Sequence, residues 1–440
     1  MSLFGSLTTA ISGLTAQSSA LGHVSDNIAN SQTVGYKRVD TNFVSYLTQS
    51  SNSSHAPGSV IARPDYANAV QGTIEQSESP LALAIGGGGF FSVAASAGTG
   101  TNGLPKFDDR QFFSRAGDFR LDDNGYLENG SGYFLQGWPA DAAGNPDRTT
   151  LKAIRLEQQV FNPVATGRID LAANLPADGD PAAAAAAAPV TTQAQIYDSL
   201  GRQHPVNLTF TRNAIDNWTV GVEVPGDAVA PDRGAITVKF GSGAAPAVPD
   251  GTIGSLTGAT GSVTAANAGA GTPATISFTA NFGQGPQTVT LGLGEFGVAQ
   301  GLTQFAGKEL SVRNLEQDGV PLGAYAGVSM RENGDVAVNY DNGQNRIIAR
   351  VPLVAFNDPD KLQRLDGQAF MRTPESGEAR VTDSASNGVG KLVTGSVERS
   401  NVDIASEFTK LIVAQRAYTA NTRVVTTSDE MLQETLNMRR

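Results

Sequence analysis

Residues 4–30 read FGSLTTAISGLTAQSSALGHVSDNIAN, and apolar side chains recur in this stretch at alternating steps of three and four. The apolar members of the series are Phe4, Leu7, Ile11, Leu14, Leu21 and Ile28, with Ser18 and Ser25 between them. This heptad spacing predicts a helix of about 27 residues, or about 40 Å, with one apolar seam. Because its other faces carry Ser, Thr, Gln and Gly, we expect neighbours on several sides, or order only with a partner.

The carboxyl-terminal end of the chain repeats this pattern. The recurring apolar positions there are Ile404, Leu411, Tyr418, Val425 and Leu432, and Phe408 and Leu436 widen the seam. Asn401 and Asp403 stand where a helix N-cap belongs, so we expect a helix over about 402–438 that could bend or end at 426–428. Two terminal helices with matching seams should pair, and the rest of the chain would then be nested on a helical stalk. An ordinary antiparallel helical hairpin that closes one globular domain is the alternative.

Composition excludes several classes of protein. The 440 residues include 31 Lys and Arg against 42 Asp and Glu, a net charge of −11, which argues against nucleic acid as the main partner. Without cysteine, disulfides, thiolate metal sites and a cysteine nucleophile are excluded, and a histidine metal site would need nearly all three histidines. No apolar run is long enough to span a membrane and no basic segment opens a signal peptide, which taken alone points to the cytoplasm.

Turn signals punctuate short alternating runs through the middle of the chain. Asn-Gly pairs at 124–125, 333–334 and 342–343 predict hairpins, because this dipeptide adopts the positive φ angles of type I′ turns. Residues 48–60 are rich in Ser, Asn and Gly and predict a loop, and 139–150 and 176–189 resemble linkers. With 50 Gly, 21 Pro and only 17% charged residues, the composition favours extended β structure.

The expected fold class is therefore α+β and multidomain, with paired, coiled-coil-like terminal helices as a stalk and nested, mainly-β domains. The expected domains are 1–30 plus 402–440 as the stalk, 31–70 plus 371–401 as extended connections, 71–140 plus 316–370 as a β-rich domain, and 141–315 as an inserted outer β domain.

Signals for an enzyme are weak. Residues 292–297 spell G-x-G-x-x-G after a strand-like run, with Asp318 about twenty residues on, but no suitable crossover helix follows, so a glycine-rich β turn is favoured. The glycines at 86–89 enter a strand rather than a helix, and residues 122–125 lack the spacing of a calcium loop. We therefore expect no catalytic residues, no cofactor, no metal site and no enzymatic activity.

Residues 27–38, NIANSQTVGYKR, resemble the signature of the flagellar rod and hook family at the end of its amino-terminal helix. The matching carboxyl-terminal half comprises SNVD at 400–403, AQRAYTAN at 414–421 and TSDEML at 427–432. The pair of motifs at opposite ends is specific. Internal segments at 71–91, 114–138 and 196–218 also resemble the family, and the resemblance covers about 1–140, 190–220 and 315–440, whereas 221–315 departs from the family pattern. Length and the inserted segment favour a hook member over the shorter rod members.

The resemblance implies a structural protein that the flagellar type III apparatus exports without a cleaved signal. Such a protein polymerises into the flexible curved tube that transmits torque from rod to filament. Its implied partners are itself, the rod, hook-cap and hook–filament junction proteins and the export apparatus, with no nucleic acid and no membrane insertion. The implied location is the extracellular hook and basal body, in place of the cytoplasm. A distal rod protein, or a secreted β-rich enzyme or carbohydrate-binding protein, is the alternative.

The resemblance also assigns roles to motif residues. Asn27, Asn30, Thr33, Gly35 and Tyr36 would fix the exit from the helix, with Gly35 at a backbone angle that other residues resist and Asn30 capping the helix end. A merely stable turn is the alternative. Gln415, Arg416 and Asn421 are candidates for polar contacts between helices, with a solvated face as the alternative; Asn401 and Asp403 complete the motif set.

Overall fold

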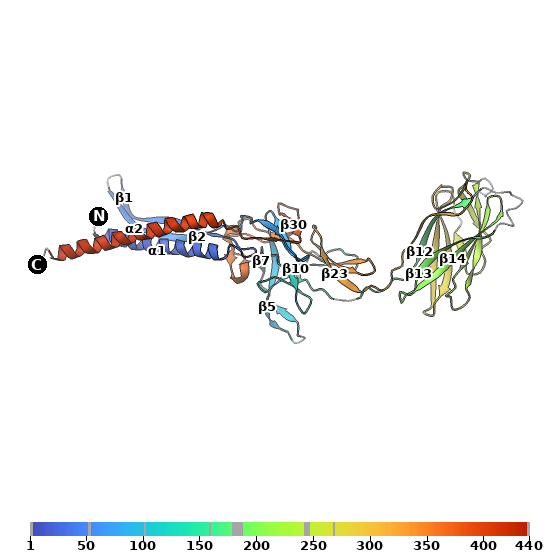
Figure 1. Ribbon diagram of the computed structural model, residues 1–440, viewed down its shortest axis with the longest axis horizontal. Coiled ribbons are helices and arrows are strands. Elements are labelled where there is room, and N and C mark those ends of the chain that lie inside the picture. The colour runs from blue at the N-terminus through green and yellow to red at the C-terminus, as the bar shows by residue number, and fades with distance from the viewer. Residues whose placement is uncertain are drawn as a thin grey trace. The chain divides into compact units, whose positions relative to one another are not determined.

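The computed structural model describes residues 3–51, 54–100, 103–157, 160–177, 188–241, 247–266 and 269–437. The chain divides into two compact units, drawn in Figure 1. The first unit comprises Met1–Gln158, Ala326–Asn339 and Asn345–Arg440, and the second comprises Gln159–Tyr325 and Tyr340–Gln344. Most of the alanine run at 182–188 lies outside the described residues.

Helices α1 (Leu3–Ala29) and α2 (Ile404–Asn437) lie side by side in the first unit and run antiparallel (Figure 1). Asp403 caps α2, because its Oδ1 accepts hydrogen bonds from Ala405 N at 2.9 Å and Ser406 N at 3.3 Å. The helix does not end at 426–428 but continues through that segment, where the Thr426 hydroxyl donates to the Arg423 carbonyl at 2.9 Å. The Thr426 hydroxyl thus bonds within the helix without interrupting it.

Strands β1 (Val39–Ser51) and β2 (Ser54–Tyr66) form an antiparallel hairpin that packs along α1. Thr9 Oγ1 donates to Gly58 O at 2.8 Å, and His23 Nδ1 lies 2.8 Å from Thr41 Oγ1. The predicted loop at 48–60 is therefore wrong for its described residues. Pairing with the opposite strand and packing on the helix outweigh the low strand propensity of Ser and Asn.

The same unit contains a mainly antiparallel β domain. The main sheet has the strand order β23-β24-β25-β10-β5-β7-β28-β27, with branching strands. Its main strands are β5 (Phe90–Thr99), β7 (Phe112–Ser114), β10 (Tyr133–Pro139), β23 (Tyr325–Met330), β24 (Asp335–Tyr340), β25 (Asn345–Arg350), β27 (Gln363–Arg364) and β28 (Ala369–Met371). The branching strands are β6 (Pro105–Phe107), β8 (Arg120–Leu121), β9 (Leu127–Glu128), β11 (Lys152–Ala153), β26 (Leu353–Ala355) and β29 (Arg380–Thr382). Short 3-10 turns occupy Pro359–Lys361 and Asp366–Gln368.

Short strand pairs join this β domain to the helices. Strand β3 (Ile74–Gln76) pairs with β31 (Ser396–Glu398), and β4 (Leu83–Gly86) pairs with β30 (Lys391–Thr394). Strands that follow α1 in the chain thus pair with strands that precede α2. Next to them, Phe90, Phe113, Phe356 and Phe370 form a buried aromatic core, in which the Phe113 and Phe356 ring centroids are 4.8 Å apart.

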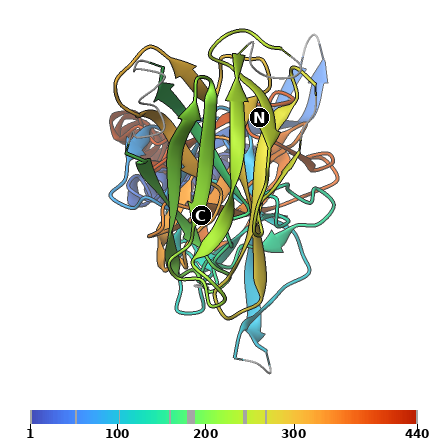
Figure 2. The same cartoon turned by 90° about the vertical axis from the view of Figure 1, so that its right-hand side faces the viewer.

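The second unit is a β sandwich whose sheets share one buried core (Figure 2). One sheet has the order β18-β19-β20-β12-β21 with β22 beside β12, and the other is a meander from β13 to β17. Alternation along β14 places Val206, Leu208 and Phe210 inside, opposite Ile276 and Phe278. The strands of the first sheet are β12 (Arg168–Pro176), β18 (Thr264–Ala266), β19 (Pro273–Asn281), β20 (Pro286–Glu295), β21 (Leu302–Phe305) and β22 (Ser311–Gln317). Those of the second are β13 (Val190–Tyr197), β14 (Gln203–Ala214), β15 (Asn217–Glu223), β16 (Asp232–Phe240) and β17 (Ile253–Thr257).

The boundaries of this unit differ from the expected 141 and 315. Residues 141–157 stay with the first unit, since Gln136 pairs with Ala153 and Leu156 N donates to Gly125 O at 2.7 Å. At the other end, β22 completes a sheet of the second unit by pairing with β12 through Gln317. The turn-rich composition at 139–150 marks a surface turn rather than the boundary.

The Asn-Gly hairpins form, but their turns are not of the predicted type. Of the two residues in each pair, only the glycine has positive φ: 82° at Gly125, 92° at Gly334 and 80° at Gly343. In the first of these turns, Asp122 Oδ1 accepts hydrogen bonds from Asn124 N and Tyr126 N, which stabilises a longer loop with a single left-handed residue.

The G-x-G-x-x-G segment lies at the end of a strand, as the sequence analysis favoured. Gly292 and Gly294 belong to β20, and Gly294 forms an isolated bridge with Gly301 across the following turn. A Cβ on Gly294 would approach the Gln300 carbonyl oxygen to 2.3 Å. Gly294 therefore serves close backbone packing.

Candidate assembly site

The terminal helices meet the β domain at a buried polar cluster, which we call the junction: Asn27, Gly35, Lys37, Arg115, Glu398, Asn401 and Glu407. Asn27 is fully buried at the last turn of α1. Its Oδ1 accepts from Val39 N at 2.9 Å, and its Nδ2 donates to Val39 O at 2.9 Å and to Glu407 Oε2 at 3.0 Å. One amide therefore bonds to the hairpin and to α2 simultaneously.

Gly35 occupies the bend that follows α1. Its φ of 72° is left-handed, and its N–H donates to the Glu398 carbonyl at 2.8 Å. A Cβ at this position would lie 2.4 Å from Ala116 N. Both the backbone angle and the close approach require glycine.

Glu398 is the centre of a buried ionic group. Its Oε1 lies 2.5 Å from Lys37 Nζ, and its Oε2 lies 2.8 Å from Arg115 NH1. Gly72 N also donates to Oε1 at 2.8 Å, and Lys37 donates to Val70 O at 2.7 Å. Burial lowers the pKa of Lys37 to about 8, against the opposing attraction of Glu398. The carboxylate thus joins the amino-terminal segment, the β domain and the carboxyl-terminal strand.

Asn401 and Asn30 make further connections near the helix ends. Asn401 Oδ1 accepts from Arg38 N at 2.7 Å, and its Nδ2 donates to Ala67 O at 3.1 Å. Asn30 Nδ2 donates to the Asp26 carbonyl at 2.9 Å at the end of α1, and Thr33 Oγ1 donates to Asn30 Oδ1 at 3.2 Å. Tyr36 completes the bend, because its hydroxyl donates to Asn27 Oδ1 at 3.2 Å.

Asn27, Gly35, Tyr36 and Asn401 belong to the motif predicted from the sequence, whereas the ionic group around Glu398 was not predicted. The signal was present, because Lys37 lies inside the first motif and Glu398 lies two residues before the second. A cation inside one motif and an anion beside its partner motif at the other end of the chain are candidates for a buried ion pair.

The buried face of α1 differs from the predicted seam by one residue step. Its buried positions, among the described residues, are Ala10, Gly13, Ala16, Ala20, Val24 and Asn27. In the seam, Phe4 and Ile11 are 67% and 48% exposed, and Leu7, Leu14, Leu21 and Ile28 are half-buried. One step turns the helix by about 100°, so the expectation that the two seams face each other is wrong for α1. Small side chains form the internal face because they let α2 and the hairpin approach closely.

The predicted seam of α2 is only partly buried. Leu411, Val425 and Leu432 are half-buried, whereas Ile404, Phe408 and Tyr418 are exposed, with Phe408 51% exposed. The Leu436 side chain lies outside the described residues. Of the polar candidates, Asn421 is half-buried, and a Cβ on Gly13 would lie 3.0 Å from its Nδ2. Gln415 and Arg416 are exposed.

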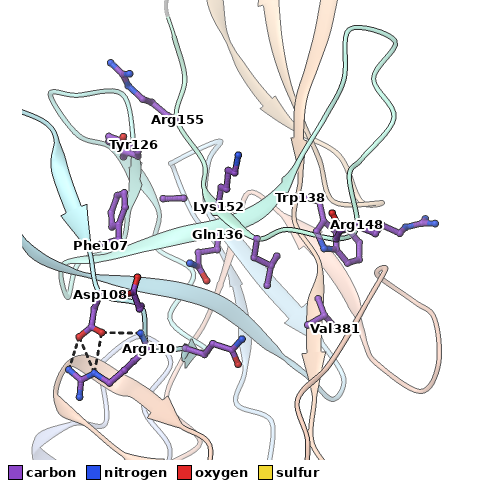
Figure 3. Close-up of a pocket in the computed structure, with 15 residues that line it drawn as sticks. Phe107, Asp108, Arg110, Tyr126, Gln136, Trp138, Arg148, Lys152, Arg155 and Val381 are labelled. Carbon is purple, nitrogen blue, oxygen red and sulfur yellow. Dashed lines mark hydrogen bonds and ion pairs between the residues drawn. The ribbon is translucent and has the colours of Figure 1, made fainter. Parts of the chain in front are cut away.

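The β domain contains a cleft of about 730 Å³ (Figure 3). Arg110 beside it is bound to Asp108, with the two side chains 2.7 Å apart. Arg148 is paired with Asp383 at 2.7 Å, and Trp138 in the floor is buried. Arg110 and Arg148 are thus each held by a carboxylate, and Lys152 and Arg155 also line the cleft.

No group of three or more His, Asp or Glu side chains in the described part of the chain is placed to hold a metal ion. Within the same residues, neither helix has the length and hydropathy of a membrane span.

Comparison with known families covers both ends and the second unit. Residues 7–37 match the model described as flagella basal body rod protein, and 393–438 match that of the flagellar basal body rod FlgEFG protein C-terminal region. Residues 168–320 match the flagellar basal body protein FlaE D2 domain, which corrects the expectation that 221–315 departs from the family. These three matches define a protein of the flagellar rod and hook class.

Full-length relatives narrow this class. The chain is 33% identical to flagellar hook protein FlgE of Brucella abortus biovar 1 (strain 9-941), with 100% of each chain covered. It is 31% identical to that of Rhizobium meliloti (strain 1021), again with 100% of each covered. The chain belongs to the flagellar hook protein family. A crystal structure of Helicobacter pylori flagellar hook protein FlgE2 aligns with a TM-score of 0.48 at 13% identity, covering 72% of this chain and 98% of that one.

Proposed function

We propose that the chain is a structural subunit of the flagellar hook that polymerises through its terminal helices. The observation that carries this proposal is the position of large apolar side chains on the outer surface of the helix pair. Phe4, Ile11, Phe408, Val413 and Met431 are all exposed in the single chain. Burying one such side chain contributes about 1.5–3 kcal/mol, so neighbouring subunits would gain by covering them.

The stalk of this proposal is the pair α1 and α2, with the seam residues of both helices as its contacts between subunits. Non-closing, repeated contacts of this kind generate a helical tube rather than a ring. The domain roles follow: the helices form the inner tube, the hairpin and short strand pairs connect it to the β domain, and the second unit faces solvent. That unit has 7 Lys and Arg against 14 Asp and Glu, a net charge of −7 of the chain's −11.

Family membership supports the remaining parts of the proposal. These are export by the flagellar apparatus without a cleaved signal, location in the extracellular hook and basal body, and contacts with the rod, cap and hook–filament junction proteins. They also include transmission of torque by a flexible tube. The proposal includes no catalysis.

Electron microscopy of polymers tests the central claim. Phe408→Asp should abolish polymers, because a charge would be buried in the contact, while circular dichroism of the monomer stays unchanged at this exposed position. Phe408→Leu keeps the position apolar and should still polymerise. Normal polymers from Phe408→Asp would contradict the role of the helix surface. In cells, deletion of the gene should remove hook and filament and retain rods.

A further inference from the structure

An apolar groove of about 490 Å³ runs between α1, β1 and α2. Its floor includes Ala20, Val24 and Ala414, which are buried, and its rim includes Phe43 and Val413, which are 43% and 62% exposed. Along one side, Lys410 Nζ lies 2.6 Å from both Asp40 Oδ1 and Glu407 Oε1. The charged side chains of the groove are thus paired with one another, whereas the apolar side chains Phe43 and Val413 on its rim remain exposed.

The same chain carries a surface of matching chemistry elsewhere. We call it the α1 stripe: Phe4, Leu7, Ile11 and Leu14, on the amino-terminal half of the helix. Phe4 and Ile11 are its most exposed members, and their spacing of seven places them on one face. The stripe is apolar and convex, whereas the groove is apolar and concave.

The antiparallel register separates the stripe from the groove of its own chain. Asn27 bonds to Glu407, and Gly13 packs against Asn421. Each step forward along α1 therefore corresponds to one step backward along α2. By this register, Val413 lies level with about residue 21 of α1, ten positions beyond Ile11. At 1.5 Å per residue the axial offset is about 15 Å, too far for the stripe to fill its own groove.

We propose that the α1 stripe of one subunit fills the groove between α1, β1 and α2 of a second copy, displaced by about 15 Å along the helix axis. This inference rests on the proposed function, for which it supplies a specific contact. The contact is heterologous, since stripe and groove are different surfaces, and each subunit therefore offers a free groove and a free stripe to further copies. An axial displacement repeated in this way extends a polymer.

The cysteine-free chain permits a direct test by cross-linking. Two single variants, Ile11→Cys and Val413→Cys, are co-polymerised and treated with a short bis-maleimide. We expect cross-linked dimers from the mixture, none from either variant alone, and loss of the dimers when polymers are dissociated before treatment. Ser19→Cys, an exposed α1 position outside the stripe, replaces Ile11→Cys in the matched control and should give no dimers.

The outcomes separate the two proposals. Polymers that form but yield no dimers above the Ser19→Cys control overturn the pairing and leave the proposed function intact. Dimers from Ile11→Cys alone would mean that stripes meet each other, which also overturns it. Failure of the unmodified full-length chain to polymerise would contradict both proposals. Should either variant assemble poorly, Phe4→Cys with Phe43→Cys tests the same contact and must give the same mixture-dependent result.

Discussion

Asn27 and Glu407 are 380 positions apart in the chain, yet Asn27 Nδ2 donates to Glu407 Oε2 at 3.0 Å in a site where both side chains are buried. Glu407 in turn holds Lys410 at 2.6 Å, and Lys410 reaches Asp40 of the hairpin at the same distance. A chain of polar contacts therefore fixes α1, β1 and α2 against one another. It sets the register in which the apolar side chains face outward.

Asn27→Asp should destabilise this arrangement by about 3 kcal/mol, because it replaces a donor with a carboxylate facing Glu407. Urea unfolding followed by helical circular dichroism measures the loss. Asn42→Asp, at an exposed position of β1, is the matched control and should change the free energy of unfolding by less than about 0.5 kcal/mol. Equal effects of the two changes would show that the buried amide is not special.

Glu398→Gln should cost about 3–5 kcal/mol of unfolding free energy, since it leaves Lys37 and Arg115 buried beside a neutral group. The corresponding change at an exposed pair, Glu75→Gln beside Arg399, should cost less than about 1 kcal/mol. Denaturant titration of both variants under one buffer compares them. A small effect at Glu398 would mean that its ion pairs are offset by desolvation.

Gly35→Ala should destabilise the junction, because the added methyl meets the Ala116 backbone and the left-handed angle opposes any side chain. Gly22→Ala makes the same chemical change inside α1, where no atom lies within 4 Å of the new Cβ. That control should be neutral or stabilising by about 0.5–1 kcal/mol, from helix propensity. Thermal melts of the two variants should therefore move in opposite directions or diverge clearly.

Acid should weaken the contact between the hairpin and α2. Burial acts to raise the pKa of Asp40, but hydrogen bonds and charges from Lys410 and Arg38 more than offset this effect. The pKa of Asp40 in the folded chain is therefore below its usual 3.8. Asp40 therefore binds a proton more readily in the unfolded chain than in the folded one. Its contribution to the free energy of unfolding is present above pH 3.8 and is lost as the pH falls through the pKa of Asp40 in the folded chain. Asp40→Asn should reduce the slope of stability against pH in this window. An unchanged slope would contradict the assignment.

The second unit should fold when residues 159–325 are expressed alone, with a β-type circular dichroism spectrum and cooperative unfolding. A fragment of 141–315 removes Glu316 and Gln317, which pair with Asp170 and Ile169 of β12, and should be less stable. Residues 141–157 of that fragment would also be separated from the β domain to which they bond. Equal stability of the two fragments would favour the boundary expected from composition.

Sequence periodicity was sufficient to predict both terminal helices, because their heptad spacing and the Asp403 cap are local signals. The face by which α1 packs was not predictable in this way. Counting large apolar residues selects Phe4 and Ile11, whereas the contact inside the chain uses Ala10, Gly13 and Ala16, whose value lies in close approach. Hydrophobicity identifies which side chains are stabilised by burial. It does not show whether a helix of the same chain or a neighbouring subunit buries them.

Other differences arise from contacts between distant residues. The Lys37–Glu398 pair depends on strand pairing between distant parts of the chain, and composition alone does not predict it. The hairpin at 39–66 is a similar case, since packing on α1 orders Ser- and Asn-rich strands that look like a loop. The turns formed where expected, because Asn-Gly marks a reversal even when only the glycine takes the left-handed angle.

The Lys37–Glu398 contact spans 361 positions, and this has a consequence for the timing of synthesis and folding. A chain that stops before residue 398 contains Lys37 and Arg115 without their shared carboxylate. The cost of burying those cations without the carboxylate would keep the segment that follows α1 open in any product that ends before residue 398. Closure at the junction therefore reports that nearly the whole polypeptide is present, and proteases would encounter an unfinished chain in its open form.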